Sequence, residues 1–138
     1  TCLATGELLS VKGTPFDFNE RKRIGQDLEA DHIQLKNAFG YDHSFVLNGT
    51  ENQLTLEEPV SGRRLVISTT APVVQVYTGN FLKDGCIGKA GRVYENREGV
   101  ALETQLMPNA INTEENPSTI LRKGDKFESN TKYVFEIM

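Results

Sequence analysis

Two short segments carry polar side chains at the alternating spacing of β-strands. In "VVQVYTG", Gln75 and Tyr77 lie two residues apart, and in "VALETQL" the same spacing separates Glu103 from Gln105. Successive strand residues point to opposite faces, so each pair shares one face of its strand. Amide and carboxylate groups bind hydroxyls and an aromatic ring covers C–H groups, a combination that suits a sugar. By pattern alone, an ordinary solvent-exposed face is the simpler interpretation.

Asp42 and His43 form a second candidate group within "FGYDHSF". An adjacent carboxylate and imidazole could hold a metal or act as an acid–base pair. Adjacent strand residues point to opposite faces, however, so the two side chains are not expected to act on one atom. The alternative is a turn in which one side chain bonds the backbone and the other is packed. His32 is the only other histidine, and its spacing from His43 predicts no zinc motif.

The elements that must position these residues are mostly β-strands. Residues 51–59 and 63–70 alternate around the turn residues 59–62, which predicts a hairpin. A third strand is predicted at 72–81, two short strands within 92–107, and two more within 118–138. One or two short helical turns are expected within 20–35, broken at Gly25. Many short strands with Gly and Pro in the turns indicate an all-β sandwich or barrel.

Composition limits the classes of protein that fit. The 138 residues suit a single domain, and a net charge of −4 without a basic patch makes nucleic acid an unexpected partner. No apolar run reaches the roughly 20 residues that cross a membrane. Cys2 and Cys86 are too few and too scattered for a disulfide framework, so we expect reduced thiols in a cytoplasmic protein.

Five blocks in order resemble the galactose mutarotase (aldose 1-epimerase) family. They are "TGE" with "GTPFDF", then "GYDHSFVLN", "PVSGRRLVISTTAPVVQVYTGNFL", "GKAGRVYENREGVALETQLMPNAIN" and "PSTILRKGDKF…TKYVFEI". The resemblance spans nearly the whole chain but only the C-terminal part of such an enzyme, so the N-terminal half is expected to be absent. It implies a large twisted antiparallel β-sandwich in which residues 1–138 are one domain, with few short helical turns.

The resemblance also implies a reaction and its residues. The family interconverts the α and β anomers of free aldohexoses such as galactose or glucose, an isomerase reaction that needs no metal and no cofactor. Glu103 matches the general base, Asp42 matches a residue that binds sugar hydroxyls, and Gln75 matches a sugar contact of some members. Tyr77 is placed beside Gln75 by strand alternation and is expected to help wall the cleft. An exposed carboxylate is a weak base at neutral pH, so we expect the cleft to bury Glu103.

One departure from the family pattern concerns the general acid. The family's acid is a histidine in a block resembling "NHSYFNL", which this sequence lacks. The chain alone is therefore expected to be a weak mutarotase or inactive, and to self-associate or pair with a separate N-terminal half. The alternatives are a non-catalytic carbohydrate-binding module and a degenerate structural fragment.

Overall fold

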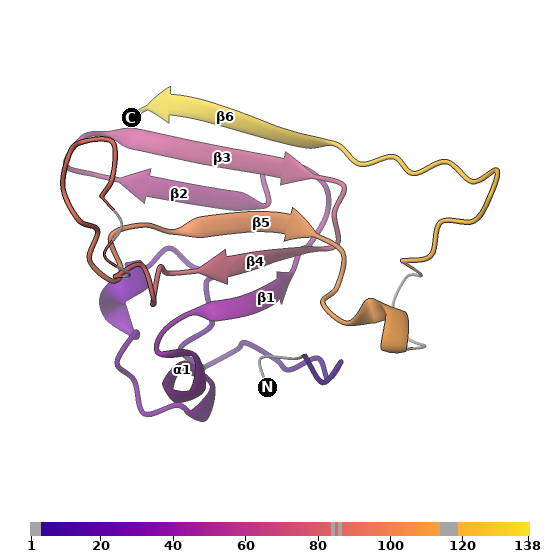
Figure 1. Ribbon diagram of the computed structural model, residues 1–138, viewed down its shortest axis with the longest axis horizontal. Helices are drawn as coiled ribbons and strands as arrows, with labels where there is room; N and C mark the ends of the chain where they lie inside the picture. Colours follow the sequence, from indigo (N-terminus) through magenta and orange to yellow (C-terminus); the bar gives the residue numbers. More distant parts are fainter. Residues whose placement is uncertain (1–3, 84, 86, 114–118) are drawn as a thin grey trace. The chain divides into compact units, whose positions relative to one another are not determined.

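The computed structural model describes residues 4–83, 85, 87–113 and 119–138; Cys2 and Cys86 lie outside them. Strands dominate these residues, together with one short helix and two 3-10 turns, which confirms the all-β prediction (Figure 1). The elements, in order, are η1 (Ile24–Gln26), α1 (Ile33–Ala38), β1 (Asp42–Val46), β2 (Leu54–Glu58), β3 (Arg63–Thr69), β4 (Val73–Tyr77), β5 (Ala101–Gln105), η2 (Ala110–Asn112) and β6 (Thr131–Ile137).

The strands form two three-stranded sheets, with the orders β1-β4-β5 and β2-β3-β6. The described residues divide into two compact units. One unit contains the described residues of 1–6, 44–74 and 103–138, and the other contains 7–43 and 75–102. Asp42, Gln75 and Tyr77 belong to the second unit and Glu103 to the first.

The predicted hairpin is confirmed in β2 and β3, which pair antiparallel from Leu54 opposite Ile67 to Glu58 opposite Arg63. The Glu58 carboxylate accepts hydrogen bonds from the backbone N–H groups of Val60 and Ser61 at 2.9 and 2.7 Å. These bonds hold the pKa of Glu58 below its usual value. The last strand residue of β2 thereby stabilises the turn that leads into β3.

The two faces of the β2-β3-β6 sheet differ in chemistry. Glu57, Arg64 and Glu136 lie directly opposite one another in the register. Arg64 forms ion pairs with Glu57 at 2.8 Å and with Glu136 at 3.4 Å. The other face is mainly apolar and carries Leu54, Leu56, Leu65, Ile67, Tyr133, Phe135 and Ile137, with the pair Glu58 and Arg63 at one end and the pair Thr69 and Thr131 at the other. A row of opposite charges across three strands specifies this register, because a one-residue slip would exchange the two faces.

The apolar face becomes exposed toward β6. Ile67 in the central strand is completely buried, whereas Tyr133 and Phe135 are 48% and 79% exposed. The alternation expected for the last strand is confirmed, but its apolar side chains are not part of the core. The buried apolar residues of the described chain are Phe16, Leu35, Tyr41, Ile67, Val73, Val74 and Ala110.

Two sequence predictions about strands are wrong. Residues 119–122 form no strand, and residues 92–97 contribute only the isolated bridge between Ile87 and Val93. The Asp125 carboxylate accepts from the backbone N–H of Arg122, and the Asp125 N–H donates back to the Arg122 carbonyl. This local turn satisfies the backbone groups that a strand would pair. Within the described part of the chain, no helix has the length and apolar character to cross a membrane.

We expect the isolated chain to self-associate through β6, the edge strand of its described sheet. Antiparallel pairing of two β6 strands about Val134 would place Lys132 opposite Glu136 and Tyr133 opposite Phe135. Such cross-strand pairs are favourable, and exposed strand edges pair readily. Phe135→Lys should lower the weight-average mass in sedimentation at tens of micromolar protein, whereas Lys132→Ser should change it less. A wild-type monomer at every concentration would contradict this expectation.

Candidate functional site

The segment that carries Asp42 begins where helix α1 ends. His32 caps the helix, since its Nδ1 accepts from the Gln34 backbone N–H at 3.3 Å. The helix stops at Phe39, whose φ of 58° is left-handed, and the Gly40 N–H donates to the Leu35 carbonyl at 3.0 Å. Such a left-handed cap reverses the chain direction. It delivers Tyr41 and Asp42 directly into β1.

Buried polar contacts from Thr78 and Asn80 hold the Tyr41 backbone. The Thr78 N–H donates to the Tyr41 carbonyl at 3.0 Å, and the Tyr41 N–H donates to Thr78 Oγ1 at 3.1 Å. Asn80 Nδ2 donates to the same Tyr41 carbonyl at 3.0 Å and to the Ala38 carbonyl at 2.8 Å. Tyr41, Thr78 and Asn80 are at most 4% exposed. Buried polar groups that are all paired in this way define one backbone arrangement.

Gly40 is required at this point because the network occupies the space beside it. Its φ is 141°, a conformation that other residues rarely adopt. A Cβ atom added there would overlap Asn80 Oδ1 and lie 3.0 Å from Thr78 Oγ1. No sequence pattern predicted a role for Gly40, Thr78 or Asn80. The signal available was the polar run "TGN" immediately after a strand.

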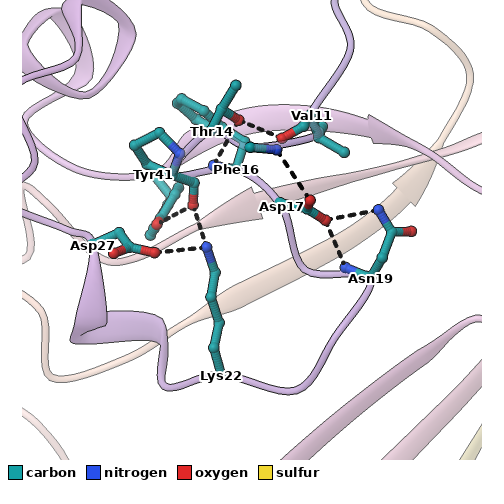
Figure 2. A network of polar contacts seen from close by, with 10 residues as sticks. Val11, Thr14, Phe16, Asp17, Asn19, Lys22, Asp27 and Tyr41 are labelled. Atoms are coloured by element: carbon teal, nitrogen blue, oxygen red, sulfur yellow. Dashed lines mark hydrogen bonds and ion pairs between the residues drawn. The ribbon is translucent and has the colours of Figure 1, made fainter.

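The Tyr41 side chain anchors the same segment from the other side (Figure 2). Its hydroxyl donates to the Pro15 carbonyl at 2.8 Å, and Lys22 Nζ donates to that carbonyl at 2.7 Å. Lys22 also pairs with Asp27 at 2.8 Å. Burial, together with the charge of Asp27, raises the pKa of Tyr41 to about 12. Tyr41 is therefore a neutral hydrogen-bond donor at any physiological pH.

Asp42 and Gln75 are brought together by the structure. Gln75 Nε2 donates to Asp42 Oδ1 at 2.7 Å, and the Asp42 side chain is exposed. This carboxylate accepts no other hydrogen bond within the ranges that the structure describes, and because its side chain is exposed it can accept hydroxyl groups. The pair combines a carboxyl group with an amide that can both donate and accept.

Tyr77 lies on the same strand as Gln75, but its hydroxyl is engaged. The Phe81 backbone N–H donates to the Tyr77 hydroxyl oxygen at 2.9 Å. The ring therefore helps to hold the turn that follows β4. It is partly buried, so it retains a surface that another group can contact.

Glu103 is the exposed residue at the centre of β5. The burial expected of a general base is therefore not supplied by the residues that the structure describes. Its neighbour Thr104 is directed differently, since the Thr104 hydroxyl lies 3.1 Å from the Thr131 hydroxyl. The alternation expected for this strand, with Glu103 and Thr104 on opposite faces, agrees with these surroundings.

His43 is packed and is poorly suited to donate a proton. Its ring contacts Phe16 edge-on, with 4.6 Å between centroids, and Nδ1 accepts from the Asp42 backbone N–H at 3.0 Å. Burial lowers the pKa of His43; the Asp42 charge opposes this shift, and nearby His32 adds to it. Asp42 and His43 thus do not act on one atom, as adjacent strand residues should not. No cluster of three or more potential metal ligands occurs among the residues described.

Comparison with known proteins matches the "Aldose 1-epimerase" family model to residues 1–134. Galactose mutarotase of Homo sapiens is 37% identical over 140 residues, covering 99% of this chain and 40% of the relative. Aldose 1-epimerase of Escherichia coli (strain K12) is 37% identical over 134 residues, covering 93% of this chain and 38% of the relative. The chain thus spans about two-fifths of the length of these relatives.

Solved structures agree with this match. The crystal structure of a GalM/aldose epimerase homologue from C. elegans has a TM-score of 0.84 at 30% identity, covering 98% of this chain and 40% of that one. Galactose 1-epimerase from Lactobacillus acidophilus NCFM has a TM-score of 0.68 at 27% identity, with coverage of 98% and 39%.

The packing of His43 makes stability depend on pH. Its pKa is lower in the folded chain than the 6.5 of an ordinary histidine, so the unfolded chain binds more protons below that pH. The contribution of His43 to the free energy of unfolding is complete above pH 6.5 and is lost as the pH falls through the folded value. His43→Asn keeps an acceptor for the Asp42 N–H and removes the titration.

Urea unfolding between neutral and mildly acidic pH measures this effect. The wild type should lose stability over that range, and His43→Asn should lose distinctly less. The matched His32→Asn variant retains His43 and should keep most of the dependence. Equal pH slopes in the wild type and His43→Asn would show that burial of His43 is not the cause.

Proposed function

Because the chain belongs to the aldose 1-epimerase family, we propose that it is a segment of an enzyme that interconverts the anomers of free aldohexoses such as galactose or glucose. In this proposal, the segment binds the sugar and carries the general base. The observation that carries this proposal is the Gln75–Asp42 hydrogen bond, with its 2.7 Å distance and its exposed carboxylate. Asp42 binds sugar hydroxyls, Gln75 orients Asp42 and contacts the sugar, and the Tyr77 ring walls the site.

In the proposed reaction, Glu103 is the general base. Its carboxylate takes the proton of the anomeric hydroxyl while the C1–O5 bond breaks and a general acid protonates the ring oxygen. The open sugar rotates about its C1–C2 bond, and O5 then attacks the other face of the C1 carbonyl. The proton on O5 returns to the acid, and Glu103 returns its proton to O1. No net charge or atom is gained or lost.

The general acid of this proposal lies outside the residues assigned so far. His43 is poorly placed to serve, because burial lowers its pKa and its ring packs on Phe16. Glu103 is exposed, so water competes for its carboxylate and limits its strength as a base. Both observations support weak or absent turnover by the chain alone, with full activity requiring a cover and an acid from elsewhere.

The second candidate function is a carbohydrate-binding module without turnover. The exposed position of Glu103 and the packed state of His43 favour it, since binding through Asp42, Gln75 and Tyr77 needs neither residue. The two functions differ in what they require of Glu103. Binding alone tolerates its loss, whereas turnover does not.

We expect D-galactose to bind beside Asp42. In an NMR titration, the amide signals of Asp42 and Gln75 should shift in the wild type and in Glu103→Gln. They should not shift in Asp42→Ala, because this variant lacks the acceptor for the sugar hydroxyls. Asp31→Ala is the matched control, since Asp31 is an exposed aspartate of the same unit that pairs with Lys36. No shifts in the wild type would reject sugar binding by this chain.

Polarimetry on fresh α-D-glucose separates the enzyme from the binding module. The wild-type chain, supplemented with the N-terminal part of a family member, should accelerate mutarotation. Glu103→Gln should lower that rate by about 10²–10⁴-fold, the usual contribution of a general base. If the rate equals that of buffer both with and without the N-terminal part, the binding module is the better interpretation.

A further inference from the structure

We propose that Thr78 and Asn80 are positioning residues that hold the Asp42 carboxylate in its sugar-binding place by fixing the Tyr41–Asp42 peptide group. This inference rests on the proposed role of Asp42. It adds two residues that do not touch the sugar and that follow β4 directly.

The first step is that the network is complete and has one orientation. The Thr78 hydroxyl has a single hydrogen and two acceptors within reach, Asn80 Oδ1 at 2.7 Å and the Tyr41 carbonyl at 3.1 Å, of which Asn80 Oδ1 is the nearer. With Oδ1 accepting, the two hydrogens of Asn80 Nδ2 serve the carbonyls of Ala38 and Tyr41. No buried side-chain nitrogen or oxygen within the described residues is left without a partner. A flipped Asn80 amide would set oxygen against both carbonyls, so the arrangement excludes that alternative.

The second step is that this network holds the peptide plane that includes Asp42. The Tyr41 carbonyl and the Asp42 N–H belong to one planar group. The carbonyl accepts from the Thr78 N–H and from Asn80 Nδ2, each at 3.0 Å. On the other side, the Asp42 N–H donates to His43 Nδ1 at 3.0 Å. Both ends of the plane are therefore bonded, which fixes the position of the Asp42 Cα from which its side chain starts.

The third step is that the same short segment also holds the carboxylate. Gln75 bonds Asp42 Oδ1 and lies only three residues before Thr78. Residues 75–80 thus hydrogen-bond Asp42 at two places, its side chain and its preceding peptide group. Loss of the buried hydrogen bonds from Thr78 and Asn80 would let the Asp42 backbone shift relative to Gln75. The Asp42 carboxylate would then no longer meet the sugar hydroxyls in the geometry that binding needs.

A merely structural role would predict something else. Buried paired groups stabilise the unit in which they lie, and removing one partner destabilises it whatever it positions. Stability alone therefore cannot identify positioning. The useful readouts are the state of the Gln75–Asp42 hydrogen bond without sugar and the affinity for sugar in the folded population.

Thr78→Val and Thr78→Ser form the decisive pair. Valine has nearly the shape of threonine but neither accepts from the Tyr41 N–H nor donates to Asn80 Oδ1, whereas serine retains both bonds. Asn80→Ala removes the two bonds from Nδ2 and serves if Thr78→Val does not fold. Asn96→Ala is the matched control, because Asn96 is an exposed asparagine of the same unit that accepts from the Lys83 N–H.

The first measurement uses no sugar. The Gln75 side-chain amide signal in ¹⁵N NMR reports its bond to Asp42. It should move toward the value of the Asp42→Ala variant in Thr78→Val and Asn80→Ala, and stay at the wild-type position in Thr78→Ser and Asn96→Ala. An unmoved signal in folded Thr78→Val and Asn80→Ala would overturn the proposal.

The second measurement is D-galactose affinity. Thr78→Val should weaken binding by about tenfold, comparable to the loss of one hydrogen bond to a charged group. Thr78→Ser should restore it. In an Asp42→Asn background, which keeps one acceptor oxygen and so retains weaker binding, Thr78→Val should cause a much smaller further loss, because a positioning residue acts through its target. An equal further loss would contradict positioning.

The two proposals fail in distinguishable ways. If the wild type binds no galactose but the Gln75 signal still moves in Thr78→Val, the sugar-binding function fails while the hold on Asp42 stands. If the wild type binds galactose and folded Thr78→Val binds it equally well, the function stands and the positioning role fails.

Discussion

The hydrogen bonding of the Tyr41 backbone is the constraint on which this part of the molecule depends. Its carbonyl and N–H are both held by Thr78, and Asn80 adds a second donor to the carbonyl. The side chain is buried and bonded to Pro15. Because its backbone and side chain are both held, Tyr41 fixes the position of the backbone of its neighbour, Asp42. Gly40 is the conformational requirement of this arrangement, since any side chain there would displace Asn80.

The polar groups around β1 and β4 divide into an inner and an outer set. The inner set, Tyr41, Thr78 and Asn80, is buried and hydrogen-bonded. Its one titratable side chain, Tyr41, has a pKa of about 12 and stays protonated at neutral pH. The outer set, Asp42 and Gln75, is paired to each other and presents a carboxylate to solvent. A binding group of this kind gains specificity from being pre-organised, because little freedom remains to be lost when a sugar binds. Glu103 differs from both sets, since its strand leaves it exposed.

Sequence patterns predicted the parts of the fold that depend on neighbours in the chain. The β2-β3 hairpin follows from alternating residues on either side of a tight turn, and β4 from a β-branched run. The strand expected near Ile120 does not form, because the local bonds of Asp125 compete with pairing. Strand β1 was not predicted, since Asp42 and His43 also fit a turn. Which residues hold Tyr41 could not be predicted, because Thr78 and Asn80 contact it across almost forty residues of chain.

In the candidate site, too, local sequence patterns predict some features and miss those that depend on distant parts of the chain. Asp42 and Gln75 were assigned from the resemblance of their sequence blocks to the family, and the structure brings them into contact, which no sequence pattern predicted. The burial expected for Glu103 is not observed in the described chain, since burial depends on groups that no local pattern specifies. Tyr77 was expected to help wall the cleft, and no sequence pattern predicted that its hydroxyl accepts from the Phe81 N–H in the turn after β4.

Amide hydrogen exchange at Tyr41 tests the central claim most directly. If the backbone of this residue is the constraint described, its N–H should exchange only when the whole unit unfolds. Its exchange free energy should therefore match that of the most protected amides and respond to urea with the same slope. Exchange of the Tyr41 N–H by a local opening that is insensitive to urea, while those amides stay protected, would contradict the account.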